Sequence, residues 1–204
     1  MKTMNKALGV AGAVAAYAGA NALARNWYLH WGAMPEEQKA ALPGDEFAPR
    51  ISSTRAVTIH APVEKVWPWL VQIGQDRGGF YSYDLLEQAI GAGIHNADRI
   101  VPEWQQLEVG DTVRLASKRV YGDKPLLRVL ALERNHYLVL EHWGAFVLHR
   151  VDRETTRLII RTHADPRTRA GKVAEMMLLD LMHFVMERKM MLGIKERAEQ
   201  GGDH

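Results

Sequence analysis

The chain has 204 residues, of which 25% are charged and 47% are hydrophobic, and its formal net charge is +2. This composition indicates a globular protein with one domain of ordinary size plus an appendage, and the small net charge argues against a dedicated nucleic-acid surface. Because the sequence contains no cysteine, disulfides, thiolate catalysis and cysteine-based zinc sites are excluded.

Residues 1–26 differ from the rest of the chain in hydropathy. Residues 7–23 carry no charge and are rich in alanine and glycine, and lysines precede them. A retained membrane anchor, a cleaved signal peptide and a buried soluble helix all fit a run of this length. We favour a single-pass anchor, because Trp27, Tyr28 and Trp31 follow the run as an interfacial aromatic belt would. The lysines favour, by a small margin, an extracytoplasmic domain.

Residues 27–53 combine prolines, glycines and mixed charge. This is typical of a linker that packs on a domain, and a short helix fits residues 36–42. The folded domain is expected over residues 54–199, followed by a polar tail at 200–204. Its first element is a strand at 54–60, whose alternating pattern predicts one buried face.

Two helices are expected after this strand. Apolar side chains recur at helical spacing over residues 61–74. Pro68 is expected to kink or split this first helix, because proline lacks a backbone donor. The second helix is expected at 82–90, where Ser82 can act as the N-cap.

The rest of the chain predicts an antiparallel meander followed by one long helix. The helix is expected over about 169–199, and it contains six of the nine methionines. Because the helices are grouped rather than alternating with strands, the fold class is α+β, a curved antiparallel sheet with a long helix across it. Five strands with a period of two are expected at 111–117, 126–133, 137–143, 145–152 and 156–164.

Three segments carry a family resemblance: "RAVTIHAPVEKVWPWLVQIG", "GGFYSYDLLEQAIGAGIHNADRIVPEWQQLEVGD" and "AFVLHRVDRETTRLIIRTHAD". They resemble bacterial members of the SRPBCC superfamily, the START-related and polyketide cyclase/dehydrase-like proteins. The segment "WGAMPEEQKAALPGD", which follows the apolar run, resembles a membrane-anchored branch. The resemblance implies a helix-grip fold, in which a curved antiparallel sheet wraps around a long C-terminal helix and two short helices follow the first strand. It leaves the function open, because one scaffold can carry many functions.

The resemblance also implies a cavity between the sheet and the C-terminal helix. We therefore expect the chain to bind a lipid or another hydrophobic small molecule there, at a membrane and without a cofactor. Methionine suits such a cavity because it is flexible and polarisable. The expected ligand-binding residues are Trp67, Phe80, Tyr81, Tyr83, Trp104, Trp143, Phe146, Met177, Leu181 and Phe184.

An enzyme is the alternative, and the sequence leaves this question open. A polyketide cyclase or dehydrase needs polar cavity residues that transfer protons, and the candidates are Tyr81, Tyr83 and His95. A third possibility is a partner-binding domain with a filled core. No spacing indicates a metal, since His95 and Asp98 form an isolated pair, and no motif indicates a serine nucleophile. The oligomeric state is not indicated.

Overall fold

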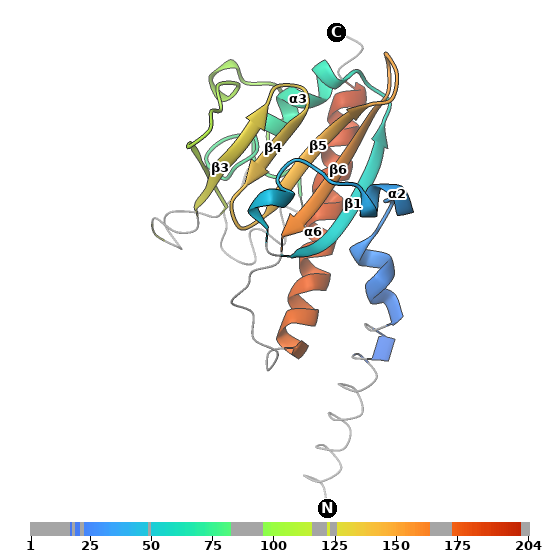
Figure 1. Cartoon of the computed structure of the whole chain (residues 1–204). Helices are drawn as coiled ribbons and strands as arrows, with labels where there is room; N and C mark the ends of the chain where they lie inside the picture. Colours follow the sequence, from blue (N-terminus) through green and yellow to red (C-terminus); the bar gives the residue numbers. More distant parts are fainter. Residues whose placement is uncertain are drawn as a thin grey trace, which may run out of the picture.

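The described part of the chain forms one antiparallel sheet with a long helix across one of its faces (Figure 1). The structure is a computed structural model, and it describes residues 17, 19–20, 23–48, 50–82, 96–115, 122, 126–163 and 173–200. For residues 173–179 it describes the backbone alone. The architecture confirms the predicted α+β class, with its curved antiparallel sheet and C-terminal helix.

The sheet contains six described strands in the order β1-β6-β5-β4-β3-β2, and neighbouring strands are antiparallel. Strands β2 to β6 follow one another as a meander, whereas β1 pairs with the last strand. Each predicted strand is present, but β4 ends at Leu140 because residues 141–143 form the turn into β5. The strands are β1 (Ile51–Ile59), β2 (Thr112–Arg114), β3 (Leu126–Glu133), β4 (Tyr137–Leu140), β5 (Gly144–Arg150) and β6 (Thr156–His163).

Helix α3 (Val63–Val71) is the first of the two helices expected after β1. It continues through Pro68 and ends three residues later, so the proline does not split it. Proline inside a helix costs about 3 kcal/mol, whereas each large apolar side chain that is fully buried contributes about 1.5–3 kcal/mol. Packing therefore outweighs the cost of the proline. The second predicted helix, at 82–90, lies outside the described residues apart from Ser82. The buried residues of α3 are Val63, Val66, Trp67, Trp69, Leu70 and Val71.

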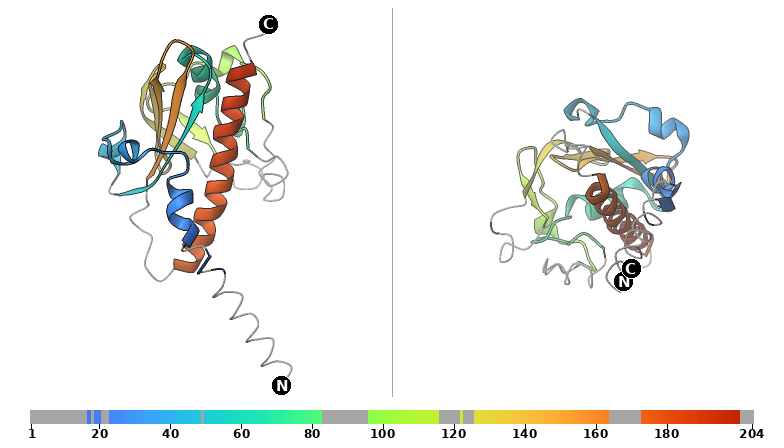
Figure 2. Two further views of the ribbon diagram at one scale, coloured as in Figure 1. Left: turned by 90° about the vertical axis from the view of Figure 1, so that its right-hand side faces the viewer. Right: turned by 90° about the horizontal axis from the view of Figure 1, so that it is seen from below.

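Helix α6 (Val173–Gln200) is the long helix that the sequence predicts, and it lies against the sheet and α3 (Figure 2). Gly193 interrupts its side-chain pattern for a steric reason, because a Cβ at this position would lie 2.5 Å from the carbonyl oxygen of Tyr81. Met190 and Met191 are buried in the main core, whereas Met182 is exposed. The methionines therefore do not form one continuous apolar face.

The segment expected as a linker crosses the outer face of the sheet, opposite α6 (Figure 2). We name residues 32–48 the strap, and it contains α2 (Pro35–Lys39) and the 3₁₀ turn η1 (Asp45–Phe47). Burial of Leu42 makes a second apolar core on this face. Strand β1 is therefore covered on both faces, and the prediction of a single buried face is wrong. The sheet residues in this second core are Ala56, Val139, Ala145, Val147 and Ile159.

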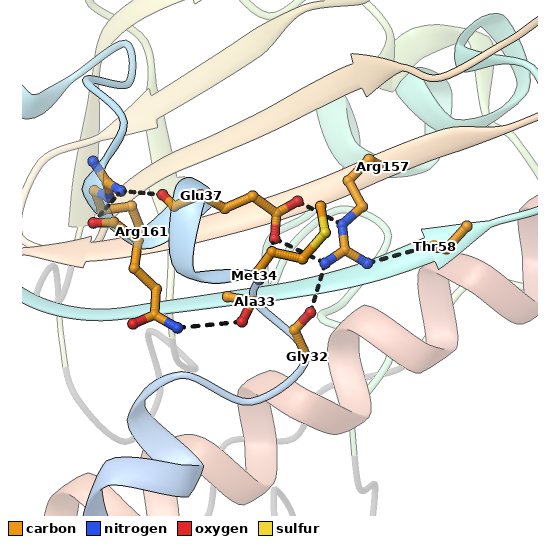
Figure 3. A network of polar contacts seen from close by, with 8 residues as sticks. Gly32, Ala33, Met34, Glu37, Thr58, Arg157 and Arg161 are labelled. Atoms are coloured by element: carbon orange, nitrogen blue, oxygen red, sulfur yellow. Dashed lines mark hydrogen bonds and ion pairs between the residues drawn. The ribbon is translucent and has the colours of Figure 1, made fainter.

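Two arginines of β6 hold the strap (Figure 3). Arg161 is buried, and its guanidinium donates to the carbonyl oxygens of Ala40 and Glu37 and pairs with Asp45, each at 2.7 Å. Arg157 binds the Glu37 carboxylate through Nε at 2.7 Å and Nη2 at 2.8 Å. Burial raises the pKa of Glu37, but the contacts with Arg157 outweigh it, so the net pKa lies below its ordinary value. The strap is thus an integral part of the domain.

The helix at residues 23–29 lies beside α6 and delivers aromatic side chains to it (Figure 1). The rings of Trp27, Tyr28 and Trp31 lie 5.5, 5.7 and 6.3 Å from the ring of Phe184. Tyr28 is buried in this contact, so it is not available to the membrane interface that the sequence suggested, whereas Trp27 is 60% exposed. No helix among the described residues is both long and apolar enough to cross a membrane. Most of the apolar run expected as an anchor lies outside the described residues.

Candidate functional site

A buried charged pair lies between the sheet and α6. Glu187 is on the face of α6 that contacts the sheet, about one turn from Phe184 and from Met191, which are both buried. Arg55 enters from β1, and its Nη1 lies 2.5 Å from Oε1 of Glu187. The arginine side chain is 1% exposed and the glutamate side chain is fully buried. The two charges therefore neutralise each other away from water.

The second carboxylate oxygen of Glu187 is also surrounded by donors. Nε1 of Trp143 donates to Oε2 at 3.0 Å, and Oγ1 of Thr162 donates to it at 3.3 Å. Nε2 of His183, one turn earlier on α6, lies 3.5 Å from the same oxygen. Burial raises the pKa of Glu187, but His183, Arg55 and the hydrogen bonds together lower it below the ordinary value. Glu187 is therefore ionised at neutral pH.

Stability alone does not explain this charged pair. Replacing a buried ion pair by apolar residues of similar volume is often neutral or stabilising, whereas removing one partner costs about 3–5 kcal/mol. The main core on α6 and the sheet consists of apolar side chains, so an apolar pair at positions 55 and 187 would extend it, apart from the contacts with Thr162 and the indole N–H of Trp143. Buried ionisable groups with specific charge partners are candidates for functional sites.

Trp143 is the centre of an aromatic group beside the charged pair. Its ring lies 5.7 Å from Phe80, 5.3 Å from Phe146 and 5.9 Å from the imidazole of His183. Phe80 and Phe146 are buried, whereas Trp143 and His183 are partly exposed. The arrangement gives an apolar wall with polar groups beside it, which is the composition of small-molecule sites.

The turn between β4 and β5 positions Trp143. Gly144 follows it with a φ of 138°, and a Cβ there would lie 2.0 Å from the carbonyl oxygen of Arg161. Only glycine allows such a close approach of β5 to β6. The backbone N–H of His163 donates to the carbonyl oxygen of Trp143 at 2.8 Å. The backbone carbonyl oxygen and the indole N–H of Trp143 therefore both make hydrogen bonds, and these fix the orientation of the ring.

The other expected ligand-binding residues lie in several places. Phe184 contacts the guanidinium of Arg55 at 5.3 Å on the side of the helix at residues 23–29, and half-buried Leu181 packs in the same cluster. Trp67 is buried in α3, where it lines a small depression of about 190 Å³. Trp104 belongs to a 3₁₀ turn, and its carbonyl oxygen accepts a hydrogen bond from Arg77. Residues outside the described part are Tyr83, His95 and the side chain of Met177.

Tyr81, a candidate for both binding and proton transfer, lies fully buried in a structural network. Its hydroxyl donates to the carbonyl oxygen of Trp69 at 3.1 Å and accepts from Nε2 of Gln72 at 3.0 Å. Its φ is 54°, and its N–H donates to Oδ1 of Asn96 at 2.5 Å. Burial raises the pKa of Tyr81 well above its ordinary value. These contacts favour a role in anchoring the loop.

A polar depression of about 490 Å³ lies beside Tyr81, between this loop and the C-terminal half of α6. Arg197 crosses it, with its guanidinium 4.7 Å from the ring of Tyr81 and its Nε donating to the carbonyl oxygen of Ala97 at 2.9 Å. The lining carries both signs of charge and no aromatic group besides Tyr81. The lining residues are Tyr81, Ser82, Asn96, Asp98, Lys189, Glu196, Arg197 and Gln200.

Sequence reasoning missed Arg55, His183 and Glu187. The signal was present, since Glu187 interrupts the apolar stripe of α6 and Arg55 interrupts the pattern of β1. His183 and Glu187 are four residues apart, which places them side by side on a helix. Among the described residues, no three histidine, aspartate or glutamate side chains converge in a way that could hold a metal ion.

No protein-family model matches this sequence, and a search of curated proteins gives no significant match.

Proposed function

We propose that the chain binds a lipid or another hydrophobic small molecule between the sheet and α6, within a helix-grip fold of the SRPBCC type. The order of the elements supports this proposal, because β1, α3, the meander and α6 follow one another as the resemblance implies. A long helix across a curved antiparallel sheet is also compatible with that fold. The proposal places the ligand against the aromatic group around Trp143.

Trp143 is the single observation that carries the proposal. Its ring is partly exposed although it rests on the buried rings of Phe80 and Phe146, and its N–H is held by the buried carboxylate of Glu187. A rigid aromatic surface offers apolar contact at a low cost in side-chain entropy. The buried charges beside it supply polarity without net charge, which suits a mainly apolar ligand.

We further propose that the domain acts at a membrane, with residues 7–23 as a single-pass anchor and the domain on the extracytoplasmic side. The exposed side chains of Leu23 and Trp27 support this proposal, because they lie where the apolar run meets the domain. Tryptophan is enriched at membrane interfaces. The anchor would keep the ligand site close to a source of lipid.

The experiment is to identify the molecules that copurify with the full-length protein. Native mass spectrometry and solvent extraction would detect an apolar ligand, and we expect Trp143→Leu to retain about tenfold less of it, which corresponds to about 1.4 kcal/mol. Tyr137→Leu is the matched control, because Tyr137 is a partly buried aromatic residue on the outer face. Repeatedly empty wild-type protein that also takes up no added fatty acid or alcohol would contradict the proposal.

A cyclase- or dehydrase-type enzyme is the second candidate, and the contact between His183 and Glu187 favours it. An imidazole held by a carboxylate can serve as a general acid or base. A panel of polyketide-like substrates tests this candidate, with His183→Gln expected to abolish turnover while ligand binding remains. If the protein binds these substrates but converts none of them, the enzyme candidate is contradicted and the binding function remains.

A further inference from the structure

Two of the described histidines lie at nearly the same distance from a glutamate and are exposed to a similar degree. Nε2 of His183 is 3.5 Å from Glu187, and Nδ1 of His136 is 3.4 Å from Glu133. The two imidazoles are similarly accessible, with side chains that are 41% and 45% exposed. The carboxylates differ, because Glu187 is fully buried whereas Glu133 is 60% exposed. Of these two histidines, only His183 therefore contacts a carboxylate that is shielded from water.

The carboxylate of Glu187 is closed to a ligand, because its side chain is fully buried and both of its oxygens already have partners. Arg55 occupies Oε1, and Trp143, Thr162 and His183 surround Oε2. A carboxylate offers about four acceptor positions on its two oxygens. A ligand that approaches the group from the accessible side therefore meets the indole face and the imidazole, rather than the anion itself.

The contact with Glu187 orients the imidazole, because Nε2 is the ring nitrogen that lies 3.5 Å from the carboxylate. In an imidazole that donates through Nε2, the other nitrogen, Nδ1, carries a lone pair that accepts a hydrogen bond. The carboxylate that the imidazole contacts is itself paired with Arg55 on β1.

We propose that His183 selects hydrophobic ligands that carry a hydroxyl group, by accepting a hydrogen bond from that hydroxyl through Nδ1. This inference rests on the proposed ligand-binding function and adds to it the chemical class of the ligand. A phenol and a long-chain alcohol share this chemistry, and both are tested. An ether or hydrocarbon of the same shape makes the same apolar contacts but offers no donor, so it binds more weakly.

The experiment compares matched probes on the full-length protein by equilibrium dialysis. One pair is 1-naphthol and 1-methoxynaphthalene, and the other is 1-dodecanol and methyl dodecyl ether. In the pair that fits the site, we expect the hydroxyl compound to bind about tenfold more tightly, the effect of one hydrogen bond in a desolvated site. In His183→Phe this preference should fall to about onefold, while the affinity for the ether changes by less than about twofold.

Two further variants separate recognition from folding. His136→Phe should keep the full preference, since its glutamate partner is exposed to water. His183→Asn retains a polar group that can replace Nδ1, so this variant should keep part of the preference for the hydroxyl compound. If His183 had only a structural role, its replacement would weaken the binding of both probes of a pair equally. Circular dichroism confirms that each variant is folded, and His183→Asn decides the question if His183→Phe does not fold.

Three results would overturn the inference. Equal binding of both members of a pair to the wild type would remove the hydroxyl preference but leave the proposed function intact. If His183→Phe still prefers the hydroxyl compound, another residue must cause that preference. If neither pair binds the wild type, the inference and the proposed function fail together.

Discussion

Removing Arg55 should destabilise the fold through the charge that it leaves behind. In Arg55→Met, Glu187 loses the guanidinium at 2.5 Å, and the carbonyl oxygen of Tyr28 loses its donor at 2.8 Å. Breaking a buried ion pair in this way costs about 3–5 kcal/mol. Chemical denaturation followed by circular dichroism measures this loss. The control is Arg150→Met, whose ion pair with Glu64 is exposed and should contribute less than about 1 kcal/mol.

A double-mutant cycle isolates the pair itself. In Arg55→Met/Glu187→Leu both charges of this pair are gone, and the penalty added to that of Arg55→Met is the N–H of Trp143 without an acceptor, about 1–3 kcal/mol. The double variant should therefore be no less stable than Arg55→Met alone, which requires a coupling energy of at least about 3 kcal/mol, the cost of removing one partner of the pair. Additive losses would refute the idea that the two charges depend on each other.

The pH dependence gives an independent check. The pKa of Glu187 in the folded protein lies below 4.5, so the folded state binds fewer protons than the unfolded state just below that pH. The stability that Glu187 contributes is present above about pH 4.5 and is lost as the pH falls through its folded pKa. In Arg55→Met the destabilisation should therefore be largest at neutral pH and shrink in acid. A loss that is constant with pH would contradict this account.

Three other predictions concern packing, the strap and pH. Gly193→Ala should lower the melting temperature, because its Cβ would lie 2.5 Å from the carbonyl oxygen of Tyr81. This steric effect opposes the helix preference of alanine, which is about 1 kcal/mol. An unchanged melting temperature would mean that the backbone at Tyr81 moves away at little cost. Arg161→Leu removes the ion pair with Asp45 and the hydrogen bonds to the strap carbonyl oxygens, so limited proteolysis should cleave the strap faster than in the wild type. Equal cleavage rates would mean that other contacts hold the strap in place. Burial lowers the pKa of His163 below 6.5, so the unfolded state binds more protons between that lowered pKa and about pH 6.5. Stability should consequently fall as the pH drops below about 6.5, and in denaturation series at pH 7 and 5 His163→Gln should lose part of this slope.

The strands and the long helix could be predicted because their hydrophobic periods are local. The sequence alternates with a period of two from β3 to β6, and the structure contains these strands at nearly the predicted positions. Pro68 misled the prediction about α3, because the proline rule describes a backbone cost and does not include the packing of Trp67 and Leu70.

The strap and the charged pair could not be predicted, because they depend on contacts between distant residues. Arg157 and Arg161 flank Ile159 on one face of β6, a pattern that usually indicates a face in water. The strap covers that face with residues more than a hundred positions earlier in the chain. Arg55 and Glu187 are 132 positions apart, and each charge alone looks like an interruption of an apolar pattern.

One guanidinium is shared between the helix at residues 23–29 and the surroundings of the candidate ligand site, in addition to the ring contacts of that helix with Phe184. Arg55 donates to the carbonyl oxygen of Tyr28, at the end of the helix that leads to the apolar N-terminal run, and it also pairs with Glu187 beside the candidate ligand site. Thermodynamic linkage is reciprocal: if docking of that helix changes ligand affinity, ligand binding must change the docking equilibrium by the same factor. Arg55 gives these two equilibria a shared physical contact, so Arg55 is the residue at which to test whether they are coupled.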